Sequence, residues 1–333
     1  MEDVSGRKLS LICQIVIASV LATAALIYMR SVLLPLVISL FIVVVASPVI
    51  QFGQRNMKLP RSMVIILGIA LSVVTTSLFW LVVYFSVESF ATGVDAYQEK
   101  TLVVVGDVSQ WLAQVGVSME QIDLKEALRS LPIFSVLKTI TKAFATLLGD
   151  SFIVFIIVLF LLFGQSGKEG KGNGVVLAIS NRVQKYVGAK VLTSFATSFL
   201  VGGVLVMVGL DLAAMFALLT FFLNFIPSVG SIVAVILPLP IAFLQFGFGW
   251  TFVTVLVLPL IFQFVIGNII EPKMMGESIG LHPVTLIVAL LFWGKIWGVP
   301  GMFLAVPITA IVQIICDRID ILKPVANILA GRW

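Results

Sequence analysis

Long apolar runs alternate with short polar stretches along most of the chain. A helix needs about 20 apolar residues to cross a bilayer core of about 30 Å, because its backbone polar groups must be satisfied internally where water is absent. Such runs predict membrane helices at residues 11–29, 32–50, 63–87, 152–163 with a backward extension to 147, 192–210 and 252–270. Two further regions, 213–246 and 284–316, are long enough for a pair of helices each. The pattern predicts an all-α polytopic membrane protein with about eight membrane segments.

The composition supports this prediction. Of the 333 residues, 60% are hydrophobic and 11% are charged, whereas a soluble domain has roughly 45–50% apolar and about 25% charged residues. These values exclude a secreted disulfide scaffold, a disordered chain and a nucleic-acid-binding protein whose basic residues lie on an exposed face. The two cysteines, Cys13 and Cys316, lie near opposite ends of the chain and indicate neither a disulfide framework nor a metal cluster.

Basic residues gather in alternate segments between the apolar runs. Lysine and arginine are enriched in cytoplasmic loops, and here they lie before the first run, after the second, after the fourth and in the C-terminal tail. The segment 88–150 instead carries eight acidic and five basic residues. We therefore expect both termini on the cytoplasmic side and segment 88–150 on the other side. This topology also explains the net charge of +5.

The chain is expected to have three regions: N-terminal transmembrane helices at 1–87, a polar insert at 88–150 and a C-terminal transmembrane region at 151–333. Apolar residues recur at helical spacing within the insert, and Asp123 with Glu126 is typical of a capping box. We expect a small extracytoplasmic helical insert there. Interfacial helices lying on the membrane are the alternative interpretation.

The glycine-rich loop 164–174 resembles a phosphate-binding loop only superficially. Neither Lys168 nor Lys171 is followed by the serine or threonine that a P-loop requires, and a membrane helix rather than a strand precedes it. We expect a flexible cytoplasmic linker. Residues 175–190 then predict an amphipathic helix on the inner membrane surface.

Proline and glycine interrupt both of the longest apolar regions. The interruptions contain Asn224, Pro227 and Gly230 in the first region, and Lys295, Gly298, Pro300 and Gly301 in the second. Proline frees backbone carbonyls, and free backbone groups at membrane depth are tolerated only beside protein or a water-filled cavity. Paired interruptions of this kind indicate the solute site of a transporter. The charge pattern is compatible with re-entrant hairpins and with full crossings.

Few ionisable residues lie beside the interrupted regions. Glu271 follows Asn268 at the end of one span, and Asp211 lies at the end of another. A charge at membrane depth is costly and is therefore a functional hypothesis. We expect Glu271, with Asp211 as a second candidate, to couple transport to an ion, Asn224 and Asn268 to donate or accept hydrogen bonds, and Lys295 to attract the solute. No HExxH or GxSxG motif, catalytic cysteine environment or cofactor-binding pattern points to an enzyme.

Three C-terminal blocks resemble those of the autoinducer-2 exporter family, also called the PerM-like permeases. They are the segments at 224–238, 268–276 and 280–310. The resemblance implies a bacterial cytoplasmic-membrane permease, since members have been associated with export of autoinducer-2 (AI-2) and, in other branches, with sodium/proton antiport. The matching positions of the family blocks are Pro227, Gly230, Glu271, Pro272, Gly280, Pro283, Gly298, Pro300, Gly301 and Pro307.

The leading hypothesis is a secondary transporter of the bacterial inner membrane that exports a small polar solute such as AI-2, coupled to protons or sodium. Its partners would be the lipid bilayer, the solute and the ion, with no nucleic acid and no cofactor. A sodium/proton antiporter is one alternative, although paired mid-span aspartates are absent from the sequence. A non-transporting membrane scaffold is the other. Gly202 and Gly203 would permit close helix packing, so a homo-oligomer remains open.

Overall fold

The computed structural model describes residues 2–56, 58–60, 62–70, 152–164, 174–275 and 280–332, with single positions and pairs between 73 and 88. The described residues form helices joined by short turns and contain no strand, so the protein is an all-α polytopic membrane protein. The predicted insert at 88–150 and most of the linker at 164–174 lie outside the described residues.

Nine apolar helices in the described part of the chain correspond to the predicted runs other than 63–87, most of which lies outside the described residues. Five are long and apolar enough to cross a membrane: Arg30–Ser47, Leu177–Met207, Val229–Phe246, Trp250–Met275 and Val299–Arg318. Four are shorter: Ile17–Tyr28, Phe152–Gly164, Ala213–Leu223 and Pro283–Trp297. Many large apolar side chains on these helices are exposed, as expected of surfaces that face lipid.

The described helices fall into two compact units. The first unit holds α1 (Glu2–Tyr28), most of α2 (Arg30–Asn56), helix Phe152–Gly164, the start of α6 (Gly174–Met207) and the C-terminal helices. The second unit holds α6 from Val187 onward and the helices that follow it as far as Met275.

The helix α6 is continuous where the sequence predicted two separate helices. Residues 175–190 were expected to form a surface helix separate from a span at 192–210, yet Gly174–Met207 is one helix of 34 residues. Lys190 lies within it and is 5% exposed. The separate surface helix was therefore a wrong expectation, and of the three basic residues that suggested it, Arg182, Lys185 and Lys190, the last is buried.

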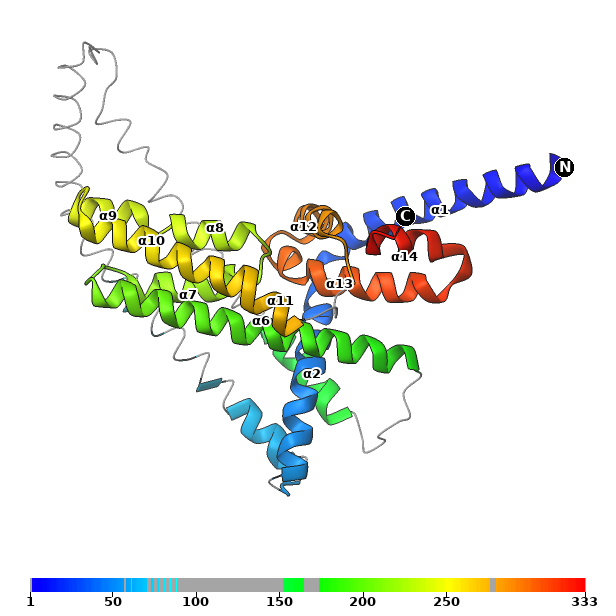
Figure 1. Ribbon diagram of the computed structural model, residues 1–333. Helices are drawn as coiled ribbons and strands as arrows, with labels where there is room; N and C mark the ends of the chain where they lie inside the picture. The colour runs from blue at the N-terminus through cyan, green and yellow to red at the C-terminus, as the bar shows by residue number, and fades with distance from the viewer. Residues whose placement is uncertain are drawn as a thin grey trace, which may run out of the picture. The chain divides into compact units, whose positions relative to one another are not determined.

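The core of the second unit is formed by α6, α7 (Ala213–Leu223), α9 (Leu239–Phe246) and α10 (Trp250–Val265). Leu205, Ala242 and Val255 have no exposed surface. The helix α8 (Val229–Ile236) packs against α7 and α10, and Figure 1 shows α8 and α10 side by side. Pro238 ends the run of α8 and begins α9, because proline cannot donate the next helical hydrogen bond.

The helix α10 changes its winding before it ends. Residues Ile266–Ile270 form one turn of π-helix, and α11 (Glu271–Met275) follows at once. Such π-turns are rare and occur frequently at functional sites. Pro272 is the second residue of α11 and has no amide hydrogen to donate to the preceding turn.

The C-terminal part of the first unit is a helical pair followed by a short amphipathic helix. The helices α12 (Pro283–Trp297) and α13 (Val299–Arg318) pack along each other, and α14 (Lys323–Ala330) packs on α13 after the 3-10 turn Asp320–Leu322, as Figure 1 shows in orange to red. His282 caps α12 with its side chain, and its backbone amide donates to the carbonyl of Leu329 at 3.0 Å.

Both interrupted regions are helical pairs with a very close approach at a glycine. In the second unit, a Cβ on Gly230 of α8 would overlap the carbonyl oxygen of Leu223 at the end of α7. In the first unit, a Cβ on Gly301 of α13 would overlap the carbonyl oxygen of Trp293 on α12. The prediction that each region holds a pair of helices is confirmed, with Val229–Phe246 counted as one apolar helix that Pro238 divides into α8 and α9. Only glycine permits the close spacing between the two backbones.

Candidate functional site

A cavity of about 550 Å³ lies within the second unit, between α6, α8 and the continuous stretch from α10 to α11. Its size is in the range of small-molecule sites. The lining residues are Lys190, Pro227, Ser228, Ser231, Ile232, Val235, Ile236, Leu256, Leu260, Gln263, Phe264, Gly267, Asn268 and Glu271. The lining has two main parts. The polar end consists of Lys190, Ser228, Ser231, Gln263, Asn268 and Glu271, and the aliphatic wall consists of Ile232, Val235, Ile236, Leu256 and Leu260.

An ion pair forms part of the polar end. The ammonium nitrogen Nζ of Lys190 donates to Oε1 of Glu271 at 2.6 Å. The two side chains are 7% and 20% exposed, respectively. Two charges removed from water in this way stabilise each other only because they are paired, and either one alone would be strongly disfavoured.

The helix register explains why Glu271 reaches this wall. Gln263, Gly267 and Glu271 follow one another at intervals of four residues, so they share one face of the stretch from α10 to α11. All three line the cavity. A Cβ on Gly267 would meet nothing within 4 Å, so the space between the two longer side chains is open.

Gln263 is the most buried polar residue in the wall besides Lys190. It is 7% exposed, and its Nε2 has no hydrogen-bond partner among the described residues. A buried donor without an acceptor is disfavoured by about 1–3 kcal/mol. Asn268 differs, because its Nδ2 donates to the carbonyl of Phe264 at 3.1 Å. The wall thus holds a buried donor that a bound acceptor could satisfy.

Irregular backbone lies at two places on the cavity wall. Ser228, in the turn between α7 and α8, has φ of 59°, and Pro227 precedes it. On the facing stretch, the π-turn Ile266–Ile270 supplies Gly267 and Asn268. Irregular backbone at membrane depth is tolerated where it borders protein or a water-filled space. Its position here agrees with a cavity that water can enter.

Three of the residues singled out from the sequence, Pro227, Asn268 and Glu271, line this cavity together. Asn224 and Gly230 belong to the same turn but lie outside the lining. Asn224 is 7% exposed, and its Oδ1 accepts no hydrogen bond from the described residues. Gly230 instead sets the spacing of α7 and α8.

Asp211 occupies the exposed turn between α6 and α7 and does not line the cavity. Its backbone amide donates to Oε1 of Gln245 at 2.9 Å, and Nε2 of Gln245 donates to the carbonyl of Gly209 at 2.8 Å. This contact holds the turn against the end of α9. The ion-coupling role of Asp211 stays a sequence-based prediction.

The remaining predicted residues belong to the first unit. Lys295 is exposed in the last turn of α12, where a cation interacts favourably with the helix dipole. Gly298, with φ of 68°, joins α12 to α13. Pro300 and Gly301 lie in the first turn of α13. Their part in a solute pathway stays a prediction.

Sequence reasoning missed four polar members of the cavity: Lys190, Ser228, Ser231 and Gln263. The spacing of Gln263 and Glu271, eight residues apart with that of Asn268 as the only other polar side chain between them, was the signal that could have revealed one of them. No signal in the sequence pairs Lys190 with Glu271, which lies 81 residues away.

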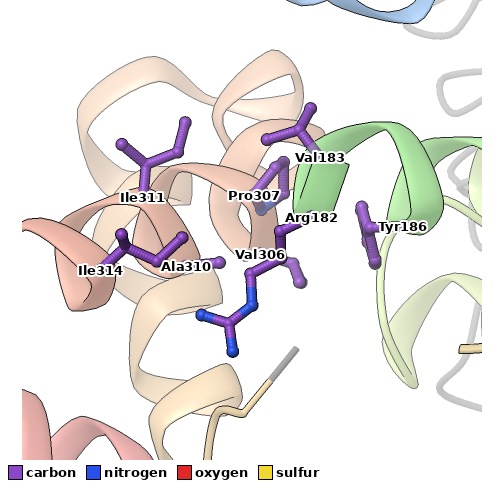
Figure 2. A pocket seen from close by; sticks show the side chains of 8 residues that line it. All are labelled: Arg182, Val183, Tyr186, Val306, Pro307, Ala310, Ile311 and Ile314. Carbon is purple, nitrogen blue, oxygen red and sulfur yellow. The ribbon is translucent and has the colours of Figure 1, made fainter. Parts of the chain in front are cut away.

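A second hollow lies in the first unit and is much smaller, with room for about one water molecule at about 10 Å³. Figure 2 shows Arg182, Val183 and Tyr186 of α6 beside residues of α13 that include Val306 and Pro307. Nη1 of Arg182 donates to Oε1 of Gln313 at 2.9 Å. The hollow is too small for an organic solute.

The profile of the family described as AI-2E family transporter matches residues 15–321. The AI-2 transport protein TqsA of Escherichia coli K12 is 25% identical over 303 residues, which are 87% of this chain and 87% of that protein. A Haemophilus influenzae Rd protein, provisionally named a transport protein, is 28% identical over 301 residues, 85% of each chain. A similarly named Borreliella burgdorferi B31 protein is 38% identical over 159 residues, 47% of this chain and 44% of that protein.

Proposed function

The chain belongs to the AI-2E transporter family, and on that premise we propose that it moves a small polar solute through the cavity of its second unit. The observation that carries this proposal is the combination of size, charge and burial in that cavity. A space of about 550 Å³ holds a small organic molecule. Its wall contains the largely buried ion pair of Lys190 and Glu271. Charges at membrane depth are costly, so such a pair indicates a functional site more than a purely structural one.

The division of the wall suits a solute that must be bound and then released. Hydrogen-bonding groups at the polar end, including Ser231 and Gln263, can replace the water that surrounds a polar solute. The aliphatic side chains of α8 and α10, such as Val235 and Leu256, form no directed bonds and would limit the affinity. Weak, shared binding of this kind favours passage over retention.

We assign ion coupling to Glu271. A carboxylate that faces both a lysine and a water-accessible cavity can exchange its partner for a proton or a sodium ion. The solute and the coupling ion would then compete for the same few groups. That competition links the movement of one to the movement of the other.

We propose AI-2 as the first solute to test, because the relative TqsA carries it in its name. We place the protein in the bacterial inner membrane with both termini in the cytoplasm, on the basis of the lysine and arginine distribution. We propose that transport runs outward, because members of the family that the chain resembles have been associated with export.

The test is a transport assay with purified protein in liposomes, in which AI-2 movement and internal pH are followed together under an imposed proton gradient. The proposal predicts AI-2 flux that depends on the gradient and falls at least about tenfold in Lys190→Gln, because the ion pair is lost. Lys185→Gln is the matched control, since Lys185 is an exposed lysine on the same helix. Proton movement that requires sodium and no solute would favour an antiporter instead. No movement of either, with helical content intact, would favour a scaffold.

A further inference from the structure

The polar end of the cavity holds a cation and a buried hydrogen-bond donor that a bound acceptor could satisfy. Lys190 has donors only, and the unpaired atom of Gln263 is its amide nitrogen. Glu271 supplies the one carboxylate among the lining residues, and it accepts from Lys190 through Oε1. A molecule that entered this space would therefore be bound best through its own acceptor oxygens.

We propose that the cavity takes a small organic carboxylate with a short aliphatic chain, which replaces Glu271 on Lys190 while Glu271 takes up a proton. This inference rests on the proposed permease function and adds an anion to the solutes that the cavity can take. The carboxylate oxygens would accept from Nζ of Lys190 and Nε2 of Gln263, and the chain would lie against the aliphatic wall.

Binding of the carboxylate requires Glu271 to take up a proton if the site is to stay neutral. The ion pair is neutral, and the rest of the lining contributes no other charged or titratable side chain from α6, α8 or the stretch from α10 to α11. An added carboxylate would leave one net negative charge beside an aliphatic wall, where it is less well solvated than in bulk water. Protonation of Glu271 by one proton from water restores neutrality, with the lysine then paired to the solute. Binding of the anion and of the proton are therefore linked.

The shape of the wall agrees with a solute that is polar at one end only. Gly267 leaves open space between Gln263 and Glu271, so a carboxylate can reach the polar end without displacing a side chain. Beyond it, Ile232 and Leu260 offer surface for a short branched or linear hydrocarbon.

The experiment measures equilibrium binding of radiolabelled isovalerate to the full chain in lipid nanodiscs, with isovaleramide as the uncharged competitor of nearly the same shape. Wild-type protein is expected to bind isovalerate, and isovaleramide is expected to compete poorly. Glu271→Gln imitates the protonated acid and is expected to bind isovalerate at least about tenfold more tightly, because two like charges a few ångströms apart repel by more than that factor. Lys190→Gln is expected to abolish binding, and Lys185→Gln to leave it unchanged.

Gln263→Leu provides a second measurement that does not alter the ion pair. It removes the unpaired donor and is expected to lower isovalerate affinity about fivefold or more. Equal binding of isovalerate and isovaleramide, or unchanged affinity in Gln263→Leu, would overturn the inference even if the charge variants fail to fold.

The two proposals can fail separately. If AI-2 is transported while isovalerate neither binds nor competes, the permease stands and the anion assignment is wrong. If isovalerate binds as described but no solute crosses the liposome membrane, the anion site stands and the permease is wrong.

Discussion

Nζ of Lys190 lies 2.6 Å from Oε1 of Glu271 and so joins the middle of α6 to the start of α11. This contact explains two features that are unusual separately. A lysine can be buried within a long apolar helix because its charge is balanced. A glutamate can follow a π-turn on the wall of a cavity because it has a cation to face.

The first prediction concerns the coupling of the two charges. Either Lys190→Gln or Glu271→Gln alone leaves one buried charge without its partner, so each should lower the free energy of unfolding by about 2–3 kcal/mol. The double variant removes both charges and should recover most of that loss. Unfolding by sodium dodecyl sulfate, followed by circular dichroism, measures all three. Purely additive losses would show that the two side chains do not interact.

The second prediction separates the cavity from the fold. Gly267→Leu places a side chain into open space, so the protein should keep its stability within about 1 kcal/mol while solute transport falls at least about tenfold. Gly188→Leu is the control, because a Cβ there also meets nothing within 4 Å and the residue is exposed on α6. Transport that survives Gly267→Leu would place the solute pathway elsewhere.

The third prediction addresses the close glycines of the two helical pairs. In Gly230→Ala and Gly301→Ala the new methyl group would overlap backbone carbonyl oxygens, which cannot move aside as a side chain can. Each should be destabilised by about 3 kcal/mol or more.

Gly294→Ala is the control for this pair of variants. Its Cβ would meet the flexible end of the Met302 side chain at 2.9 Å, so a shift of that side chain relieves the contact. We expect a loss of about 1 kcal/mol or less. Thermal unfolding in detergent distinguishes these outcomes, and equal losses at Gly294 and Gly301 would contradict the role assigned to the carbonyl contact.

The fourth prediction concerns the anchoring of α12. Trp297 is 1% exposed, and its Nε1 donates to the carbonyl of Leu26 on α1 at 3.1 Å. Trp297→Phe removes the donor and part of the buried ring, and should lower the midpoint of thermal unfolding by several degrees. Trp250, at 85% exposed, is the control. A midpoint shift in Trp250→Phe as large as that in Trp297→Phe would count against this anchoring role.

The apolar runs predicted most of the described helices because a membrane requires about 20 apolar residues for each crossing. The resemblance to the autoinducer-2 exporter family is confirmed by the family match over residues 15–321. Both interrupted regions were predicted to be pairs of helices, since proline and glycine mark where a helix cannot continue.

The pairing of charges could not be predicted in the same way. Lys190 was interpreted as part of a surface helix, because a lone lysine in the sequence gives no indication of a distant partner. Its partner, Glu271, was singled out for its place at the end of a span, and its burial beside Lys190 depends on how α6 meets α11. Gln263 was not recognised as a site residue, because most of its neighbours in the sequence are apolar. Local patterns predict elements, whereas a cavity depends on contacts between elements far apart in the chain.

The proposed function requires the cavity of the second unit to be a water-accessible solute pathway. Its most direct test is the reaction of Ser231→Cys, made with Cys13→Ser, with a membrane-impermeant thiol reagent, because Ser231 lines the cavity and Cys13 is exposed. Ile261→Cys on the same background is the control, since Ile261 is exposed on α10 and outside the cavity. We expect Ser231→Cys to react much faster than Ile261→Cys, the reaction to stop transport, and solute to slow the reaction. Equal rates, or labelling at Ser231→Cys that leaves transport unchanged, would show that the solute does not pass through this cavity.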